Sequence, residues 1–311
     1  MQKQIRPRVL VTGGAGFIGS NLIRRMVDRN FAAEVVSIDN YHTGSPRNHV
    51  PDGRVRYLKG NTMEIAELWD EHDLGLIPLV FHLGEYARVA QSFEEHDRVW
   101  EFNVLGTKEV TRVCRERGAR LVYAASSSKF GGGGANEHLS PYAWTKAKNV
   151  EYIRNIGRWY GLDYVITYFY NAYGPGQIST GPYATVIGIF EEQFRSGQPL
   201  TVVEPGTQTR DFTHVSDIVD GLLLCAAKGQ GDGYALGRAE EHRLIDVARM
   251  FGDAVLMLPL RRGERMRGRA DNSKARALGW RPKIALEDYV AAVRMKHLES
   301  RSLATPQGAG Q

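Results

Sequence analysis

The sequence contains little cysteine and no long apolar segment. Its two cysteines, Cys114 and Cys225, cannot build the set of cross-links on which small secreted folds depend, so a disulfide framework is excluded. The best candidate for an apolar run, residues 222–227, is far shorter than the ~20 residues that cross a bilayer. An expected strand begins almost directly after residues 1–4, which leaves no room for a signal peptide. We therefore expect a cytoplasmic protein with no membrane partner.

The chain also lacks a large excess of charge of either sign. Its 40 Lys and Arg and 35 Asp and Glu give a formal charge of +5, and most basic residues are scattered among acidic ones. Nucleic-acid-binding proteins instead collect Lys and Arg on one face, so we predict no nucleic-acid partner. The exception is a cluster of five arginines, namely Arg261, Arg262, Arg265, Arg267 and Arg269. A small phosphorylated ligand is the stronger interpretation of this cluster, and we expect no metal ion.

The first half of the sequence alternates short apolar runs with amphipathic stretches. Strands are expected at residues 9–11, 35–38, 55–58, 79–82, 121–125 and 164–169, and helices at 16–28, 99–117 and 142–160. Continuous apolar strands separated by helices are typical of a parallel sheet that is covered on both faces. The predicted fold class is therefore α/β, a doubly wound parallel (Rossmann) sheet with a smaller C-terminal substrate-binding region.

The texture of the sequence changes after Asn171, where turn residues and arginine become frequent. We expect residues 1–171 plus about 209–232 to form a dinucleotide-binding domain, and about 172–208 plus 233–302 to form a substrate-binding domain. The segment at 210–224 is expected to form a strand and a helix that return to the large sheet. Residues 303–311 lack apolar anchors and are expected to be a disordered tail.

A glycine-rich turn follows the first expected strand. Gly13, Gly16 and Gly19 are spaced so that a tight turn leads into a helix whose free N–H groups can hold a pyrophosphate. Asp39 follows the next strand, 20 residues after Gly19, where a carboxylate can bind both ribose hydroxyls of an adenosine and would repel a 2′-phosphate. The sequence therefore predicts a dinucleotide site that takes NAD in preference to NADP.

Three polar residues form a candidate catalytic set. Tyr142 and Lys146 are four residues apart, on one face of an expected helix, and Ser126 follows the fifth expected strand. A tyrosine hydroxyl ordinarily titrates near ~10 and is a poor base at neutral pH, but a neighbouring ammonium group and a nicotinamide ring stabilise the phenolate. Ser126 can donate a hydrogen bond to the reacting oxygen. On its own this spacing is usually structural, and it becomes specific only beside the glycine turn.

Taken together, these motifs resemble the extended short-chain dehydrogenase/reductases, in particular the NAD-dependent nucleotide-sugar epimerase/dehydratase family. The resemblance covers nearly the whole chain. Further motifs that carry it lie at residues 81–84, 103–107, 140–142, 171–177, 208–215, 261–264, 270–271 and 278–282.

The resemblance implies two sets of binding residues. The expected NAD site consists of Gly13, Gly16, Phe17, Ile18, Gly19, Asp39, Asn40, Asn61, Leu83, Gly84, Asn103, Tyr142 and Lys146. The expected nucleotide-sugar site consists of Ser127, Asn171, Arg210, Arg261 and Glu264. Arginine suits this task because its planar guanidinium meets phosphate oxygens with two parallel hydrogen bonds. Within the arginine cluster only Arg261 is expected to bind, and some of the other arginines are expected to lie in solvent.

The family's first step takes the proton of a sugar 4-hydroxyl and oxidises C4 to a ketone, and later steps differ between members. Dehydratases of the family carry an Asp-Glu pair directly after the catalytic hydroxyl residue, where this sequence has Ser127 and Ser128. Neither serine has the acidity or basicity that the elimination needs. We therefore predict an NAD-dependent epimerase that inverts C4 of a nucleotide sugar, with UDP as the expected nucleotide.

Alternatives remain open. A 4,6-dehydratase or a 4-dehydrogenase/reductase could use the same Tyr142–Lys146 pair, and a non-catalytic NAD sensor could keep the fold alone. Departures from the family pattern add titratable groups that could extend the chemistry beyond C4, namely Glu85, Lys129, Glu137 and His138.

Two further expectations concern substrate size and assembly. Gly268 matches a position at which a small residue in the family admits N-acetylated sugars, unless Arg267 or Arg269 fills the space. Helices near residues 98–117 and 142–160 resemble those that pair in homodimers of the family. Apolar residues on them could contact a second copy or could equally face the sheet, namely Val99, Phe102, Val110, Trp144, Ile153 and Ile156.

Overall fold

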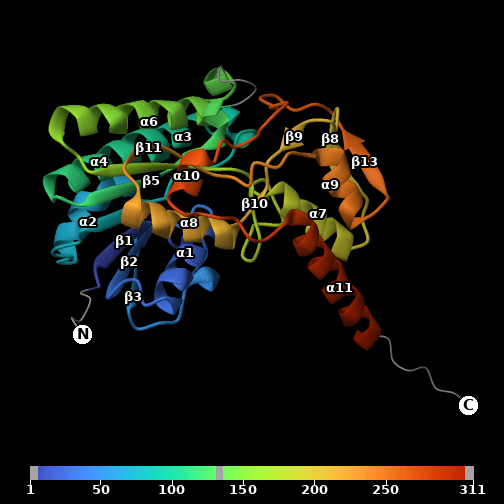
Figure 1. Cartoon of the computed structure of the whole chain (residues 1–311), viewed down its shortest axis with the longest axis horizontal. Coiled ribbons are helices and arrows are strands. Elements are labelled where there is room, and N and C mark those ends of the chain that lie inside the picture. Colours follow the sequence, from blue (N-terminus) through green and yellow to red (C-terminus); the bar gives the residue numbers. More distant parts are fainter. Residues whose placement is uncertain (1–5, 131–135, 305–311) are drawn as a thin grey trace, which may run out of the picture.

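Seven parallel strands form the central sheet of the computed structural model, which describes residues 6–130 and 136–304 (Figure 1). In spatial order they are β11 (Gly231–Leu236), β6 (Tyr164–Phe169), β5 (Arg120–Ser126), β4 (Leu79–His82), β1 (Arg8–Thr12), β2 (Glu34–Asp39) and β3 (Val55–Lys59). The strand order reverses between β1 and β4, and ligands of such sheets bind at the carboxyl ends of the strands on either side of that reversal. The predicted doubly wound sheet is confirmed.

Helices cover both faces of this sheet (Figure 1). Alternate side chains of a strand point to opposite faces, so Val9 and Val11 enter one apolar core while Leu10 enters the other. The helices packed on the Leu10 side are α2 (Ile65–Glu71), α4 (Gly106–Glu116) and α6 (Pro141–Tyr160), and those on the other side are α1 (Phe17–Asp28), α8 (Val215–Lys228) and α10 (Ser273–Ala277). Burial of both faces explains why the strands are apolar throughout.

A smaller region follows the sixth strand and has a third apolar core, which includes Phe190, Val202 and Phe251. It contains α7 (Val186–Arg195), α9 (Leu244–Phe251) and α11 (Leu286–Ala304), together with three pairs of short strands: β7 (Ala172–Tyr173) with β10 (Thr213–His214), β9 (Thr209–Arg210) with β12 (His242–Arg243), and β8 (Leu200–Val203) with β13 (Val255–Leu258). Figure 1 shows this region beside the carboxyl edge of the large sheet.

The structure changes three details of the predicted organisation. The expected boundary at about residue 232 falls inside β11, which pairs with β6, so residues 233–236 belong to the large sheet. The expected strand near residue 210 does not join that sheet, because β9 and β10 pair with β12 and β7, and only α8 returns to it. Residues 303 and 304 end helix α11, and the rest of the expected tail lies outside the described residues.

Both cysteines are buried free thiols, and burial raises the pKa of Cys225 to about 12. Among residues 6–130 and 136–304, no helix combines the length and the apolar character that a membrane span requires.

Candidate active site

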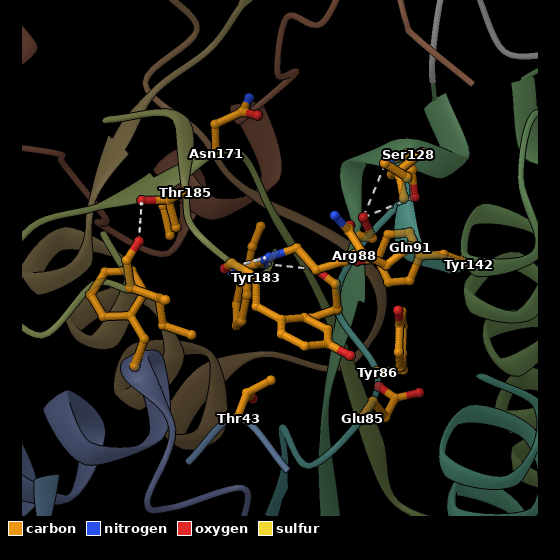
Figure 2. A pocket seen from close by; sticks show the side chains of 18 of the residues that line it. Thr43, Glu85, Tyr86, Arg88, Gln91, Ser128, Tyr142, Asn171, Tyr183 and Thr185 are labelled. Atoms are coloured by element: carbon orange, nitrogen blue, oxygen red, sulfur yellow. Dashed lines mark hydrogen bonds between the residues drawn. The ribbon is translucent and has the colours of Figure 1, made fainter. Parts of the chain in front are cut away.

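A single cavity of about 560 Å³ brings the predicted motifs together. Its walls come from the carboxyl ends of the central strands and from the smaller region. Figure 2 shows Tyr142 on one side of it and Asn171 and Thr185 on the opposite side. A cavity of this size, at the edge where the strand order reverses, is where a doubly wound fold binds its ligand.

The glycine turn forms one end of the cavity, and side chains would obstruct it. Gly13 has a φ of +74°, and a Cβ there would lie 2.8 Å from the Cα of Gly84. A Cβ on Gly19 would lie 2.1 Å from the carbonyl oxygen of Gly13, so bare backbone is needed for helix α1 to approach β1. No side chain caps this helix at Gly16, which leaves its first N–H groups available to an anion. The turn fits the pyrophosphate of a dinucleotide.

Asp39 lies on the same cavity at the end of β2. One carboxylate oxygen accepts a hydrogen bond from the Ala15 N–H at 2.9 Å, and the other accepts one from the Tyr41 N–H at 2.8 Å. Burial raises the pKa of Asp39, although both backbone hydrogen bonds act in the opposite direction. The backbone thus fixes the Asp39 carboxylate beside the glycine turn, on the wall of the cavity.

Tyr142 is positioned by the start of helix α6. The hydroxyl of Ser140 caps this helix by accepting a hydrogen bond from the Ala143 N–H at 3.1 Å, and Pro141 occupies the first turn. Tyr142 and Lys146 both line the cavity, as does Ser126. The structure thus brings these three residues to one cavity, as the sequence predicted.

Ser126 is held by the residue two positions later. Its Oγ accepts hydrogen bonds from the Ser128 N–H at 3.2 Å and from the Ser128 hydroxyl at 2.9 Å (Figure 2). Because two donors occupy its lone pairs, the hydroxyl of Ser126 has its own proton left to donate.

Lys146 forms a buried ion pair with Glu85, the side chains of which are 7% and 1% exposed. The Lys146 ammonium also donates to the carbonyl oxygen of Ala124 at 2.7 Å. The second oxygen of Glu85 accepts hydrogen bonds from Thr107, Tyr123 and Asn149, at 2.9 to 3.0 Å. Every partner of the Glu85 carboxylate is a donor of the protein, so neither of its oxygens is left for substrate chemistry.

The residues expected to hold a nucleotide sugar all line the cavity: Ser127, Asn171, Arg210, Arg261 and Glu264. Two of them are paired with each other, because Arg210 forms an ion pair with Glu264 in which the side chains are 12% and 16% exposed. Arg210 also donates to the carbonyl oxygens of Thr209 and Arg265, at 2.8 and 2.6 Å. Most of the hydrogen-bonding capacity of Arg210 is thus used inside the protein.

The cavity lining contains most of the predicted NAD residues, with Phe17, Ile18, Asn40 and Leu83 among them, but not Asn61 or Asn103. Asn61 accepts a hydrogen bond from the Asn40 side chain at 2.9 Å, so it supports a lining residue from behind.

Asn103 also lies behind the wall of the cavity. It is fully buried in a π-helical turn, Trp100–Leu105, that joins α3 (His96–Val99) to α4. Its side chain accepts a hydrogen bond from the Tyr86 N–H at 2.7 Å and donates to Thr145 at 3.0 Å. In this structure Asn103 thus supports the cavity wall through Tyr86, and its contact with NAD stays a prediction.

The four titratable groups that depart from the family pattern do not lie together. Only Glu85 lines the cavity, whereas Lys129, Glu137 and His138 lie outside its lining. The glycines at 131–134 lie outside the described residues.

Three arginines of the cavity lining were not predicted as site residues. Arg88 lines it and donates through its guanidinium to the carbonyl oxygen of Tyr183, which ties the loop after β4 to the smaller region (Figure 2). Arg265 and Arg262 line it as well, whereas Arg267 and Arg269 are exposed elsewhere. The cluster of five arginines was visible in the sequence. No periodic pattern distinguishes the members that line the cavity, such as Arg265, from those that do not.

Comparison with known proteins shows which family this chain belongs to. Residues 9–237 match the model of the NAD dependent epimerase/dehydratase family. A UDP-glucose 4-epimerase of Mycolicibacterium smegmatis is 32% identical over 310 residues, which cover 91% of this chain and 96% of the relative. UDP-glucuronic acid decarboxylase 6 of Arabidopsis thaliana is 29% identical, with 92% of this chain and 87% of the relative covered.

A solved structure has the same architecture throughout. The UDP-glucose 4-epimerase of Thermus thermophilus, in complex with NAD, superposes with a TM-score of 0.83 at 30% sequence identity, covering 94% of this chain and 99% of that one. With the glycine turn, Asp39 and the Ser126, Tyr142 and Lys146 set on one cavity, the chain belongs to the NAD-dependent epimerase/dehydratase family of extended short-chain dehydrogenase/reductases.

Proposed function

We propose that this protein binds NAD and inverts C4 of a nucleotide sugar, with UDP as the nucleotide. The observation that carries the proposal is the shared cavity, in which Ser126, Tyr142 and Lys146 lie beside the glycine turn and Asp39. NAD, when bound, supplies the chemistry of accepting a hydride from C4 and returning it. The glycine turn and the first turn of α1 would hold its pyrophosphate, and Asp39 its adenosine ribose.

The protein's own residues handle the proton and the oxygen at C4. Tyr142 takes the proton of the 4-hydroxyl, and the ammonium of Lys146 stabilises the phenolate. The Ser126 hydroxyl donates a hydrogen bond to the same oxygen, which stabilises the partial negative charge on that oxygen as C4 becomes a ketone. In the reverse direction Tyr142 would return the proton to the same oxygen, so that C4 is inverted with no net redox change.

The surroundings of C4 support epimerisation more than elimination. Ser127 and Ser128 occupy the positions of the dehydratase acid and base, and the Ser128 hydroxyl is spent on Ser126. Glu85 is the remaining carboxylate near Lys146, and all of its contacts are with donors of the protein. A second proton transfer at C5 thus has no obvious agent beside Ser126.

Product analysis tests the proposal. Incubation with UDP-glucose, UDP-N-acetylglucosamine and GDP-mannose should give an equilibrium mixture of C4 epimers from at least one of them, with no lasting absorbance at 340 nm. Tyr142→Phe should lose turnover and keep NAD binding, because only the phenol oxygen is removed. A keto-sugar product, or lasting absorbance at 340 nm, would instead indicate a dehydratase or a dehydrogenase. NAD binding without turnover of any sugar would indicate a sensor.

We also propose that the protein is a homodimer, paired through the helices on the Leu10 side of the sheet. Val99, Val110, Ile153 and Ile156 are buried within the protein, so they are not available to a second copy. Trp100 is 41% exposed and stacks on Trp144, with ring centroids 5.8 Å apart. An exposed aromatic pair on these helices favours an interface there.

Light scattering should give a dimer mass for the wild type and a monomer mass for Trp100→Lys, and a monomeric wild type would refute the proposal.

A further inference from the structure

The guanidinium of Arg265 lies at the catalytic end of the cavity. Its Nη1 donates a hydrogen bond of 2.7 Å to the carbonyl oxygen of Ser127, the residue directly after Ser126. Arg265 and Ser127 both line the cavity. A positive charge is therefore fixed beside the residue that faces C4 in the proposed reaction.

Gly268 provides the space for this guanidinium. A Cβ on Gly268 would lie 2.4 Å from Nη2 of Arg265 and 2.9 Å from its Cζ. The sequence suggested that this glycine would admit an N-acetyl group unless Arg267 or Arg269 filled the space. The structure places Arg265 there instead, so the glycine makes room for a charged side chain of the protein.

Arg265 lacks a counter-ion among the described residues. The Ser127 carbonyl is the hydrogen-bond acceptor of its guanidinium there, and no Asp or Glu oxygen lies within 4.0 Å of its nitrogens. The nearby Glu264 is already paired with Arg210. Burial, together with the charge of Arg210, lowers the pKa of Arg265 to about 10. A half-buried cation of this kind is stabilised by an anion that enters the cavity.

We propose that Arg265 binds a carboxylate on the sugar half of the substrate, so that the preferred substrate is a nucleotide-activated hexuronic acid. This inference rests on the proposed function, that the cavity holds a nucleotide sugar. In a hexuronic acid the carboxylate carbon, C6, is attached to C5, the direct neighbour of C4. The pyrophosphate is attached at C1, on the far side of the ring. A guanidinium that touches the residue after Ser126 is thus placed for the C6 carboxylate, and its fork can bind both oxygens.

UDP-glucuronate and UDP-glucose provide the test, because they differ only at C6. The wild type should have a kcat/KM for UDP-glucuronate at least about tenfold above that for UDP-glucose. Arg265→Met should lower the value for UDP-glucuronate about 100-fold, as expected for the loss of a charged hydrogen-bonded pair, and should change the value for UDP-glucose less than about threefold. The affinity for UDP alone, measured by calorimetry, should not change.

Two further variants complete the design. Arg265→Lys keeps the charge but loses the two-pronged geometry. Its kcat/KM for UDP-glucuronate should therefore lie between that of the wild type and that of Arg265→Met. Arg267→Met removes an exposed arginine of the same segment and should leave both substrates unaffected. These variants keep the test valid if Arg265→Met does not fold.

The outcomes separate this inference from the proposed function. An equal loss for UDP-glucuronate, UDP-glucose and UDP in Arg265→Met would place the charge at the pyrophosphate and overturn the inference. So would a wild type that epimerises UDP-glucose in preference to UDP-glucuronate, although the proposed function would then stand. If UDP-glucuronate is consumed in an Arg265-dependent way but its C6 is released as carbon dioxide, the inference holds and C4 epimerisation is refuted.

Discussion

The ammonium group of Lys146 is paired with the carboxylate of Glu85, and both side chains are almost completely buried. A lysine four residues after a catalytic tyrosine acts through its positive charge, and here a full negative charge lies against it. Thr107, Tyr123 and Asn149 hold that negative charge in place. His82 lies close enough to feel both charges of the pair, and Tyr123 close enough to feel that of Glu85. The pair therefore positions Lys146 firmly and offsets part of the charge that stabilises the Tyr142 phenolate.

Glu85→Gln should shift the acidic limb of the kcat–pH profile to lower pH. Glutamine has the same shape, and its carbonyl oxygen can still accept from Thr107, Tyr123 and Asn149. Its amide nitrogen carries no negative charge and cannot accept from Lys146, which keeps its bond to the Ala124 carbonyl. The Lys146 ammonium then acts unopposed on the negative charge that develops at the Tyr142 oxygen during turnover. Steady-state kinetics between pH 5 and 9 with any substrate that is turned over would measure the shift.

The matched control for this experiment is Glu109→Gln. Glu109 lies on α4 and pairs with Arg112 at 2.8 Å, outside the cavity lining. Its removal should leave the pH profile in place. A Glu85→Gln profile that coincides with the wild type, or that moves to higher pH, would contradict the role assigned to Glu85.

Gly13→Ala should destabilise the protein and weaken NAD binding. The φ of +74° strains an alanine, and its Cβ would lie 2.8 Å from backbone atoms of Gly84. Strain of this kind costs about 1–3 kcal/mol. Urea unfolding and calorimetry with NAD would measure both effects. Gly53→Ala is the control, since a Cβ there has nothing within 4 Å and should cost little. Equal stability of the two variants would show that the turn tolerates a side chain.

The fold was predictable because its signal is local. Each central strand is apolar throughout and is bounded by turn residues, as Val9 to Val11 illustrate, and both faces of the sheet are buried. Strand β11 was the exception. It begins with Gly231 and Asp232 and contains Gly233, so its sequence is typical of a turn, and it forms a strand only because β6 offers an edge for pairing.

The catalytic motifs were predictable for a similar reason. The pairing of Glu85 with Lys146 and the placement of Arg265 in the cavity were not. Tyr142 and Lys146 share one helix, so their spacing alone brings them together. Glu85 meets partners from β5, α4 and α6, which only the folded chain assembles. Arg265 lies in a segment without helix or strand, and its direction depends on the space left by Gly268. Periodicity contains no information about such contacts.

Asp39→Asn should reduce the preference for NAD over NADP. The change removes the negative charge that repels a 2′-phosphate and disturbs one of the hydrogen bonds from Ala15 and Tyr41. We expect NAD affinity to fall about tenfold or more, and NADP affinity to fall less or to rise. Calorimetry with each cofactor would measure the ratio. Asp52→Asn, which removes a carboxylate paired with Arg54, should not alter it. An unchanged ratio in Asp39→Asn would remove Asp39 from cofactor selection.

His82 should make the protein lose stability in mild acid. It is fully buried between Thr12, 2.7 Å from its Nδ1, and Thr107, 3.0 Å from its Nε2. The Thr12 hydroxyl accepts hydrogen bonds from the N–H groups of Leu83 and Gly84, so it donates to Nδ1, and the imidazole is neutral with its proton on Nε2. Burial lowers the pKa of His82 from 6.5 to about 4.

Because the pKa of His82 is lower in the folded state, its contribution is fully present above about pH 6.5 and is lost as the pH falls towards 4. Between pH 7 and pH 5 the loss should be about 2 kcal/mol, since each unit corresponds to ~1.4 kcal/mol. Urea unfolding of the wild type and of His82→Gln at both pH values would isolate the contribution of His82 to this loss, because glutamine does not titrate. The difference between the two pH values should shrink by that amount in His82→Gln and stay unchanged in His96→Gln, which removes an exposed histidine. If His82→Gln keeps the full loss, other buried groups cause the acid sensitivity and His82 is not the residue that resists protonation.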